Sequence, residues 1–327
     1  MCFRMVKARC NDNFIALTSY PQGSGAVTLL AAQTKRGVAR KPAPRLCSSL
    51  SFVTPLGASR VTNHAGLRLN HMSNPRPDID HWWAVEAMIA SYNHVYKVTY
   101  KTKYEVRGPI GVSIYDGAPI ASFQYEFLAL SADSQSVMDA VQVYSIPNGK
   151  QYIIDVFHPQ PSDPALKEKY AAYKHEFVRT GAILSLDLPP KTNTMPRNVY
   201  KATTIKQAEA ANEALTTEGE RIHLQTLRDK HIHSFYVKDG DEIAGWLQLV
   251  TIHPKAGYIN QIYVLEAFRK KKLGTALVQR AQAYAFELGL EHMVLIPSDM
   301  AMHLYRRLGY RPLLYFSAFR PNGVHHE

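Results

Sequence analysis

Cysteine is almost absent from this chain, whose 327 residues include three cysteines, at positions 2, 10 and 47, and none after them. A disulfide framework, a cysteine-based zinc site and a cysteine nucleophile are therefore excluded from the main body of the protein. The sequence also lacks any apolar run of the roughly 18 residues that a membrane-spanning helix needs, and residues 1–30 lack the continuous apolar core of a signal peptide. We therefore expect a soluble, cytoplasmic protein without membrane contact.

Acidic side chains are nearly absent from residues 1–70, which hold ten Lys or Arg and a single acid, Asp12. The formal net charge of the chain is +11, but the remaining residues hold 28 basic and 26 acidic side chains. A nucleic-acid-binding protein would carry its basic charge on a folded surface. Since the folded part is close to neutral, we do not expect a nucleic-acid partner for it.

Residues 1–71 are also rich in Ser, Thr, Arg and Lys, contain Pro21, Pro42, Pro44 and Pro55, and show no helical or strand periodicity. We therefore predict a disordered extension there. One interpretation is an organellar transit peptide, whose composition this segment resembles and which would place the protein in an organelle. The other is a non-essential extension before a natural start at Met72. The lack of an amphipathic, arginine-rich helix favours the second interpretation.

Residues 80–188 predict an α+β domain. We expect a helix over 81–92, a strand over 96–106 and a hairpin of strands 110–115 and 120–130 around Asp116-Gly117. A second hairpin is expected from strands 140–145 and 151–157, followed by a helix over 164–177 and a strand over 182–188. Residues 189–197 contain three prolines and predict a linker.

Residues 198–320 predict a second, mixed α/β domain. The expected strands cover residues 198–204, 235–238, 243–253, 258–264, 293–296 and 313–319. Helices are expected over 205–215, 221–229 and 273–288, with a short one around Tyr305. A basic turn, residues 269–272, separates the strand 258–264 from the long helix. A helix N-terminus with cations beside it is a place where an anion can bind, so we predict a phosphate-bearing cofactor there. The alternative is a solvated first turn, but cations at that end oppose the helix dipole.

Several motifs of this domain resemble the GNAT superfamily of acyl-CoA N-acyltransferases. They are Ile262-Tyr263-Val264, Phe268-Arg269, Leu273-Gly274-Thr275-Ala276-Leu277, and Leu304-Tyr305 followed by Gly309-Tyr310. The resemblance covers residues 198–320 and implies a mixed sheet with flanking helices. It also implies transfer of an acetyl group from acetyl-CoA to a primary amine of a small-molecule or protein acceptor by direct attack, with the acceptor left unidentified.

The resemblance also implies a cofactor site. In the family, backbone N–H groups of a Gly-containing turn wrap the pyrophosphate, and the preceding strand pairs with the pantetheine arm. The corresponding residues here are Ile262, Val264, Arg269, Lys270, Lys271, Lys272, Leu273, Gly274 and Thr275, with Ser298 in place of a frequent asparagine. Two positions depart from the pattern, because Glu266 replaces a proline and Lys272 replaces the first glycine. Since a lysine avoids positive φ, we expect Lys272 to have negative φ and the loop to be rebuilt.

The catalytic residues implied by the resemblance are Tyr305 and Asn260. Tyr305 falls at the family's tyrosine position and would protonate the leaving thiolate, the alternative being a core aromatic residue. Asn260 lies where relatives often carry glutamate, and we expect it to hold a water that accepts the amine's proton. The other candidate bases, Glu266, Asp299, His253 and His303, fit structural roles better.

The role of residues 80–188 is left open. Residues 116–121 resemble 239–244, and residues 173–177 faintly resemble 305–310, which would fit a degenerate GNAT-like copy; an unrelated α+β module is the alternative. Either would be a substrate-side or packing domain and not a second active site. For the whole protein, the main rival to an enzyme is a non-catalytic acyl-CoA-binding sensor or interaction module, which the changes at Glu266, Lys272 and Asn260 would suit.

Overall fold

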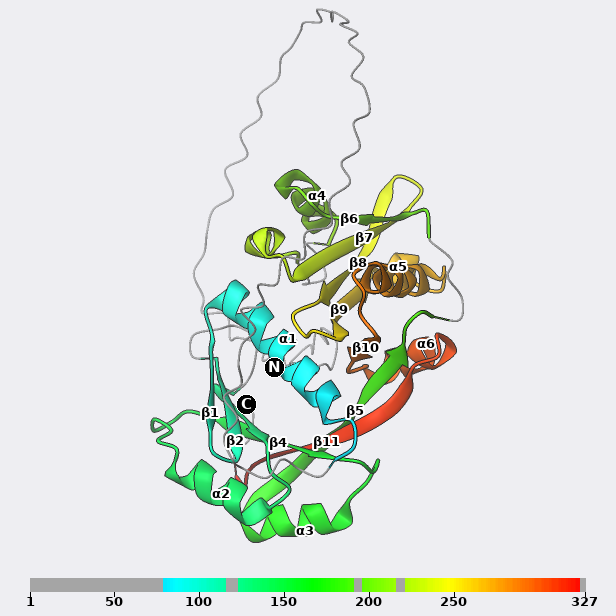
Figure 1. Cartoon of the computed structure of the whole chain (residues 1–327). Helices are drawn as coiled ribbons and strands as arrows, with labels where there is room; N and C mark the ends of the chain where they lie inside the picture. The colour runs from blue at the N-terminus through cyan, green and yellow to red at the C-terminus, as the bar shows by residue number, and fades with distance from the viewer. Residues whose placement is uncertain (1–78, 116–122, 191–195, 216–220, 324–327) are drawn as a thin grey trace, which may run out of the picture. The chain divides into compact units, whose positions relative to one another are not determined.

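The computed structural model describes residues 79–323 except 116–122, 191–195 and 216–220 (Figure 1). The predicted extension, residues 1–71, lies outside the described residues, as do residues 191–195 of the predicted linker. The α-helices are α1 Trp82–Tyr100, α2 Ser134–Val143, α3 Pro164–Ala172, α4 Ile205–Leu215, α5 Leu273–Glu287 and α6 Met302–Arg307. Short 3₁₀ helices are η1 Leu224–Arg228, η2 Glu266–Phe268 and η3 Asp299–Ala301. Within the described part of the chain, every helix is too short or too polar to span a bilayer.

Eleven strands form one mixed sheet. The strands are β1 Lys103–Arg107, β2 Ile110–Ile114, β3 Tyr125–Ala129, β4 Tyr152–His158, β5 His175–Asp187, β6 Val199–Lys201, β7 Ile232–Asp239, β8 Glu242–Val250, β9 Ala256–Val264, β10 His292–Leu295 and β11 Arg311–Pro321. Their order is β1-β2-β3-β4-β11-β5-β10-β9-β8-β7-β6. The pairs β3/β4 and β9/β10 are parallel, and the other pairs are antiparallel. Residues 80–188 and 198–320 therefore share one sheet.

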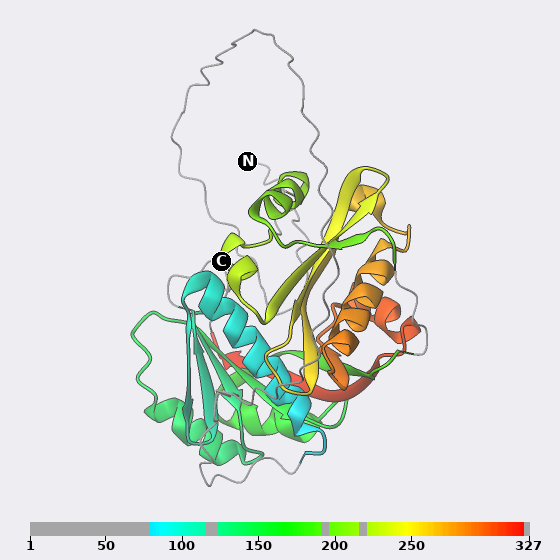
Figure 2. The same ribbon diagram turned by 45° about the horizontal axis from the view of Figure 1, so that its top comes forward.

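Helices cover both faces of this sheet. Successive residues of a strand point to opposite faces, so Ile183 of β5 packs into the core beneath α1, while Leu184 packs into the core beneath α5 and α6. Helix α1 contacts β1, β5, β9 and β10, and so lies over strands from both halves of the chain (Figure 1). Figure 2 shows α5 alongside β8 and β9. The face under α1 is therefore built by both halves together.

The first half differs from the sequence prediction at three places. The predicted helix 164–177 ends at Ala172, because strand β5 already begins at His175 and pairs with β11. The predicted strand 96–106 is wrong for its first part, because α1 continues to Tyr100 and strand β1 covers only Lys103–Arg107. Tyr92, Tyr96 and Tyr100 lie four residues apart on one side of α1, where neighbouring ring centroids are 4.3 and 6.0 Å apart. The alternation of tyrosines with polar residues also fits a strand, but the core under α1 favours the helix.

The predicted strand 140–145 is wrong as well, because residues 134–143 form α2. Val137, Met138 and Val141 of α2 are buried at helical spacing, and the Asp133 side chain caps the helix by accepting from the N–H groups of Gln135 and Ser136. The β-branched valines favour a strand locally, but the Asp133 cap and the burial of one side of the helix stabilise α2 instead.

The two halves have the same order of elements. Strands β1, β2 and β3, then α2, β4, α3 and β5, match β7, β8 and β9, then α5, β10, α6 and β11. The last strand of each half crosses over, since β11 pairs with β4, and β5 pairs with β10. Lys174 after α3 and Gly309 after α6 both have positive φ, of 60° and 91°. Residues 173–177 and 305–310 thus occupy matching places.

The other sequence similarity does not follow the topology. Asp239 and Gly240 join β7 to β8, and the matching connection in the first half joins β1 to β2 at Gly108. Residues 116–121 come later, in the connection between β2 and β3, and lie outside the described residues.

Candidate active site

A change in strand pairing marks the centre of the C-terminal half. The parallel ladder between β9 and β10 ends with the pair Ile259 and Leu295, while β9 continues beside β8 as far as Val264. Past Leu295 the chain turns away into Ser298 and η3. In the described part of the chain, the edge of β9 on the β10 side is therefore left without a neighbouring strand after Ile259. An extended ligand can pair with such an edge.

Asn260 is the extra residue of a β-bulge at this point. Gln248 of β8 pairs with Gln261, and Leu249 pairs with Ile259, so Asn260 has no opposite residue. Its Nδ2 donates a hydrogen bond to Oε1 of the buried Gln248 at 2.9 Å. The amide of Asn260 is therefore held, with its oxygen left to accept from another donor. Sequence reasoning missed Gln248, a single glutamine in the otherwise apolar run of β8.

The turn after β9 carries the predicted phosphate site. Helix α5 begins at Leu273 after Lys272, and its N-cap has no side-chain hydrogen bond and its first turn no acid. The N–H groups of Leu273, Gly274 and Thr275 are the first of the helix and have no intrahelical partner, since the bond from Ala276 to the carbonyl of Lys272 is the first one of the helix. Polar N–H groups and a positive dipole end thus meet at one exposed place.

Packing brings this turn close to the other predicted residues. Leu273 is buried at 6% exposure and anchors α5 in the core. A Cβ placed on Gly274 would lie 3.5 Å from Cδ2 of Leu304 on α6 and 3.8 Å from Cγ2 of Val264 at the end of β9. Ile262 and Val264 both pack against the same core. The strand, the turn and α6 therefore meet at the N-terminus of α5.

Two of the four predicted cations are engaged by neighbouring groups, and two are not. The Arg269 Nε donates to the carbonyl of Val264 at 3.1 Å and its guanidinium lies 4.0 Å from Glu266, so this arginine braces the turn. Lys271 pairs with Asp239 at 2.6 Å. Lys270 and Lys272 are exposed, and neither has an acidic partner within the described residues. These two are the cations available to a phosphate.

The expectation that Lys272 has negative φ is wrong. Lys270 and Lys272 have φ of 67° and 62°, in the left-handed region that favours glycine. A left-handed residue followed by the helical Leu273 turns successive N–H groups toward one side, which is the geometry of a backbone anion nest. The loop thus keeps a glycine-like backbone at Lys272. Such strain in a non-glycine residue is typical of functional sites.

Replacing Lys272 with glycine is expected to raise the free energy of unfolding by about 0.5–1 kcal/mol. Glycine removes a left-handed strain of about 1–2 kcal/mol, partly offset by about 0.5–1 kcal/mol of extra backbone freedom in the unfolded chain. Urea unfolding measures the change. Lys271→Gly is the control, because Lys271 lacks positive φ and pairs with Asp239, so it should lose stability. Equal losses in both variants would contradict the strain at Lys272.

Tyr305 lies in the core between α6 and the sheet. It is 2% exposed, and its ring makes an edge contact with Tyr310 at 5.4 Å. Burial raises the pKa of the Tyr305 phenol well above its ordinary value, so the group stays protonated at neutral pH. Ser298 is buried at 7%, and its carbonyl accepts from the N–H groups of Ala301 and Met302, which starts η3 and α6.

The remaining candidate bases lie outside this arrangement. Glu266 is 82% exposed and faces Arg269. His253 lies in the connection before β9, at the strand end opposite the turn, and His303 is exposed on α6. Burial lowers the pKa of His253. Asp299 is exposed in η3. The structure therefore joins Asn260 and Gln248 by a hydrogen bond, and within the described residues none of these four groups bonds to either of them.

The matching place in the first half is closed. The N-terminus of α2 is capped by Asp133, whose oxygens accept from the N–H groups of Gln135 and Ser136 at 3.2 Å each. The β3/β4 ladder runs to Ala129, the last residue of β3, so no edge is left exposed there. In this half, a carboxylate already accepts from the first N–H groups of the helix. The arrangement of open edge and uncapped helix therefore occurs at α5 and not at α2.

Comparisons with known proteins find similarity to acetyltransferases. Residues 199–310 match the sequence model of the Acetyltransferase (GNAT) family. An uncharacterized N-acetyltransferase of Bacillus subtilis (strain 168), YdgE, is 35% identical over 91 residues, which are 25% of this chain and 58% of that protein. A GCN5-related N-acetyltransferase from Kribbella flavida has a TM-score of 0.55 at 17% identity, covering 73% of this chain and 96% of its own. One from Sphaerobacter thermophilus has a TM-score of 0.46 at 16% identity, covering 65% and 76%.

Residues 199–310 therefore form a domain of the GNAT acetyltransferase family, with the mixed sheet and flanking helices of that fold. The alignment with YdgE spans little more than half of that relative's length. The Kribbella structure covers more of this chain than the family match does, so its similarity of fold extends into the first half. GNAT proteins as a family use acetyl-CoA, and the uncapped N–H groups and left-handed turn at α5 fit the phosphates of such a molecule.

Proposed function

We propose that this protein transfers an acetyl group from acetyl-CoA to a primary amine of its acceptor by direct attack. The observation that carries the proposal is the uncapped N-terminus of α5 beside the open edge of β9. In this proposal the N–H groups of Leu273, Gly274 and Thr275 bind the phosphates, with Lys270 and Lys272 adding charge. The open edge of β9, with Ile262 and Val264, pairs with the pantetheine arm, and Ser298 lies beside it. Bound acetyl-CoA supplies an activated acetyl thioester.

Asn260 and Gln248 support the proton transfer from the amine. An ammonium group has no lone pair and must lose a proton before it attacks a carbonyl carbon. Asn260 cannot titrate, but its oxygen is free to accept because its Nδ2 is engaged by Gln248. We assign to this oxygen a water molecule that takes the proton from the amine.

Tyr305→Phe is expected to lower kcat about ten-fold with little change in the affinity for acetyl-CoA. A phenol is protonated at neutral pH, and burial raises the pKa of Tyr305 further, so this side chain holds a proton that it can donate to the leaving thiolate. The effect is at the low end for a general acid because a thiol, with an ordinary pKa near 8.5, leaves readily as the thiolate. Release of free thiol with an amine acceptor measures kcat, and calorimetry measures binding. Unchanged kcat would make Tyr305 a core residue only.

The alternative function is a non-catalytic acyl-CoA-binding sensor. The residue types at Asn260, Glu266 and Lys272 favour it, whereas the glycine-like backbone at Lys272 favours an intact site. The full-length chain, incubated with acetyl-CoA and a broad panel of amines, separates the two. Thiol release with at least one amine supports the enzyme. Binding of acetyl-CoA without any turnover supports the sensor, and no binding contradicts both.

A further inference from the structure

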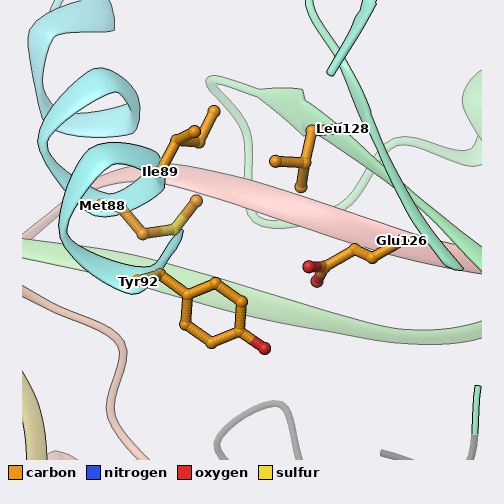
Figure 3. Close-up of a pocket in the computed structure, with 5 residues that line it drawn as sticks. All are labelled: Met88, Ile89, Tyr92, Glu126 and Leu128. Carbon is orange, nitrogen blue, oxygen red and sulfur yellow. The ribbon is translucent and has the colours of Figure 1, made fainter. Parts of the chain in front are cut away.

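Helix α1 is held by the strands of the first half. Residues of α1 and of β3 face each other across a small space (Figure 3), namely Met88, Ile89 and Tyr92 from the helix, and Glu126 and Leu128 from the strand. On β2, the Ser113 hydroxyl donates to the side-chain oxygen of Asn93 of α1 at 2.9 Å, and both side chains are buried. The position of α1 is therefore fixed by β2 and β3.

The C-terminal part of α1 is hydrogen-bonded to the second half. Its partners lie in residues 221–231, here called the η1 segment, which contain η1 and lead directly into β7. Three side-chain hydrogen bonds join the two elements: His94 Nε2 to Asp229 Oδ2 at 2.9 Å, Tyr100 Oη to His223 Nε2 at 3.1 Å, and Gln225 Nε2 to the Thr99 carbonyl at 3.1 Å. The two halves of the chain are thus tied together at this place, away from the sheet.

Asp229 joins α1 to the start of β7. Its Oδ2 accepts from His94, and its Oδ1 accepts at 2.8 Å from the backbone N–H of His231, the residue before β7. Burial alone would raise the pKa of Asp229, but the hydrogen bonds from His94 and His231 lower it below its ordinary value, so the group is a carboxylate at neutral pH. Hydrogen bonds to a charged acceptor are about twice as strong as those between neutral groups. The His94–Asp229 pair is therefore the contact that we single out.

The η1 segment has little packing of its own. Helix η1 is a 3₁₀ helix of five residues, of which Thr226 is the buried one. The hydrogen bonds of a 3₁₀ helix have poorer geometry than those of an α-helix, and segments with few buried contacts open readily. The place of this segment therefore depends on the contacts that it makes with α1.

The η1 segment and α1 lie on either side of Gln248, which holds Asn260. Gln248 points to the same face of the sheet as Trp246 and Val250, because alternate residues of a strand share a face. Val250 packs in the core under α1, and Trp246 packs in the core under α4, which also contains Ile222 of the η1 segment. Asn260 itself is only partly buried. Since α5 covers the opposite face, we place the acceptor's approach to Asn260 on the face of α1 and the η1 segment.

We propose that the His94–Asp229 pair is a positioning pair for the acceptor, which holds the η1 segment against α1 and so lets the first half shape the approach to Asn260. Neither residue takes part in the chemistry. An acceptor that needs the segment in place binds more weakly in proportion to the time that the segment spends elsewhere. The pair therefore acts on the acceptor's KM and leaves kcat and the affinity for acetyl-CoA unchanged. This inference rests on the proposed function.

The test is the variant His94→Leu of the full-length chain, which removes the donor to Asp229. The KM of an amine found by thiol release is expected to rise about ten-fold, as for a segment that is in place about a tenth of the time. His94→Gln should restore the wild-type KM, since its amide N–H can donate to the carboxylate instead. The matched control is His292→Leu, which removes a His–Asp pair of equal length, 2.9 Å to Asp187, at the start of β10. This control should leave the KM unchanged.

Amide hydrogen exchange without ligands reports on the η1 segment independently of any reaction. Exchange within this segment should be faster in His94→Leu and return to the wild-type rate in His94→Gln. If thiol release occurs with the same KM in His94→Leu and in the wild type, the enzyme stands and the positioning role is overturned. If the wild type releases no thiol with any amine, the proposed function itself fails. Should His94→Leu not fold, Tyr100→Phe removes only the hydroxyl bonded to His223 and must also raise the KM.

Discussion

Gly274→Asp is expected to weaken acetyl-CoA binding at least 100-fold while leaving the protein as stable as the wild type. The substitution puts a carboxylate at the second residue of α5, among the N–H groups proposed to bind phosphate. The loss corresponds to about 2.7 kcal/mol, about what one or two charge-assisted hydrogen bonds contribute. Repulsion between carboxylate and phosphate acts in the same direction.

Stability is expected to hold for two reasons. A Cβ at Gly274 meets Leu304 and Val264 only at 3.5 and 3.8 Å, which are ordinary contacts. An acid in the first turn of a helix is favourable because it opposes the positive end of the dipole, and α5 has none there. The variant thus separates cofactor binding from folding.

A matched control is Ala165→Asp, the second residue of α3, which is exposed and makes the same change of charge. It should leave the affinity for acetyl-CoA unchanged. Calorimetry measures binding, and urea unfolding measures stability. If Gly274→Asp binds acetyl-CoA as the control does, the phosphates do not lie at α5 and the proposed site is wrong.

Glu126 of β3 and Asp155 of β4 are buried on neighbouring strands, at 0% and 1% exposure. The double variant Glu126→Gln/Asp155→Asn is expected to raise the free energy of unfolding by about 2 kcal/mol more at pH 8 than at pH 5. Burial raises the pKa of both carboxyls in the folded chain, so above the ordinary carboxyl range the folded state binds more protons than the unfolded state. Stability therefore falls as the pH rises from the ordinary values of 3.8 and 4.5 through the raised ones. Amides remove this loss, and replacing buried charges by neutral groups often stabilises by about 1–4 kcal/mol.

Urea unfolding of wild type and variant at several pH values measures this gain. Glu168→Gln, which changes an exposed acid on α3, is the control and should follow the wild-type pH profile. Parallel profiles for the double variant and the wild type would show that the pair does not titrate differently on folding.

The sequence predicted the C-terminal half closely because its signals are local. Helix α4 was predicted at its observed bounds, and α5 and β9 to within two residues. In the first half, by contrast, the tyrosines of α1 and the valines of α2 fit two periodicities at once. Only packing against the sheet decides between them. Sequence motifs also located the uncapped turn. The preference of lysine for negative φ gave the wrong expectation at Lys272, because the loop imposes a positive φ on whatever residue stands there.

By itself, then, the sequence determined the family, the strand–turn–helix unit and the residues of the predicted cofactor site, because each depends on neighbours along the chain. Tertiary structure alone decided that β11 and β5 cross between the halves and that Gln248 holds Asn260. It also placed Glu126 beside Asp155 under α1. These contacts depend on strand pairing and register: the crossover joins the two halves, while Gln248 with Asn260 and Glu126 with Asp155 lie on neighbouring strands within one half. No spacing or composition in the sequence records that pairing.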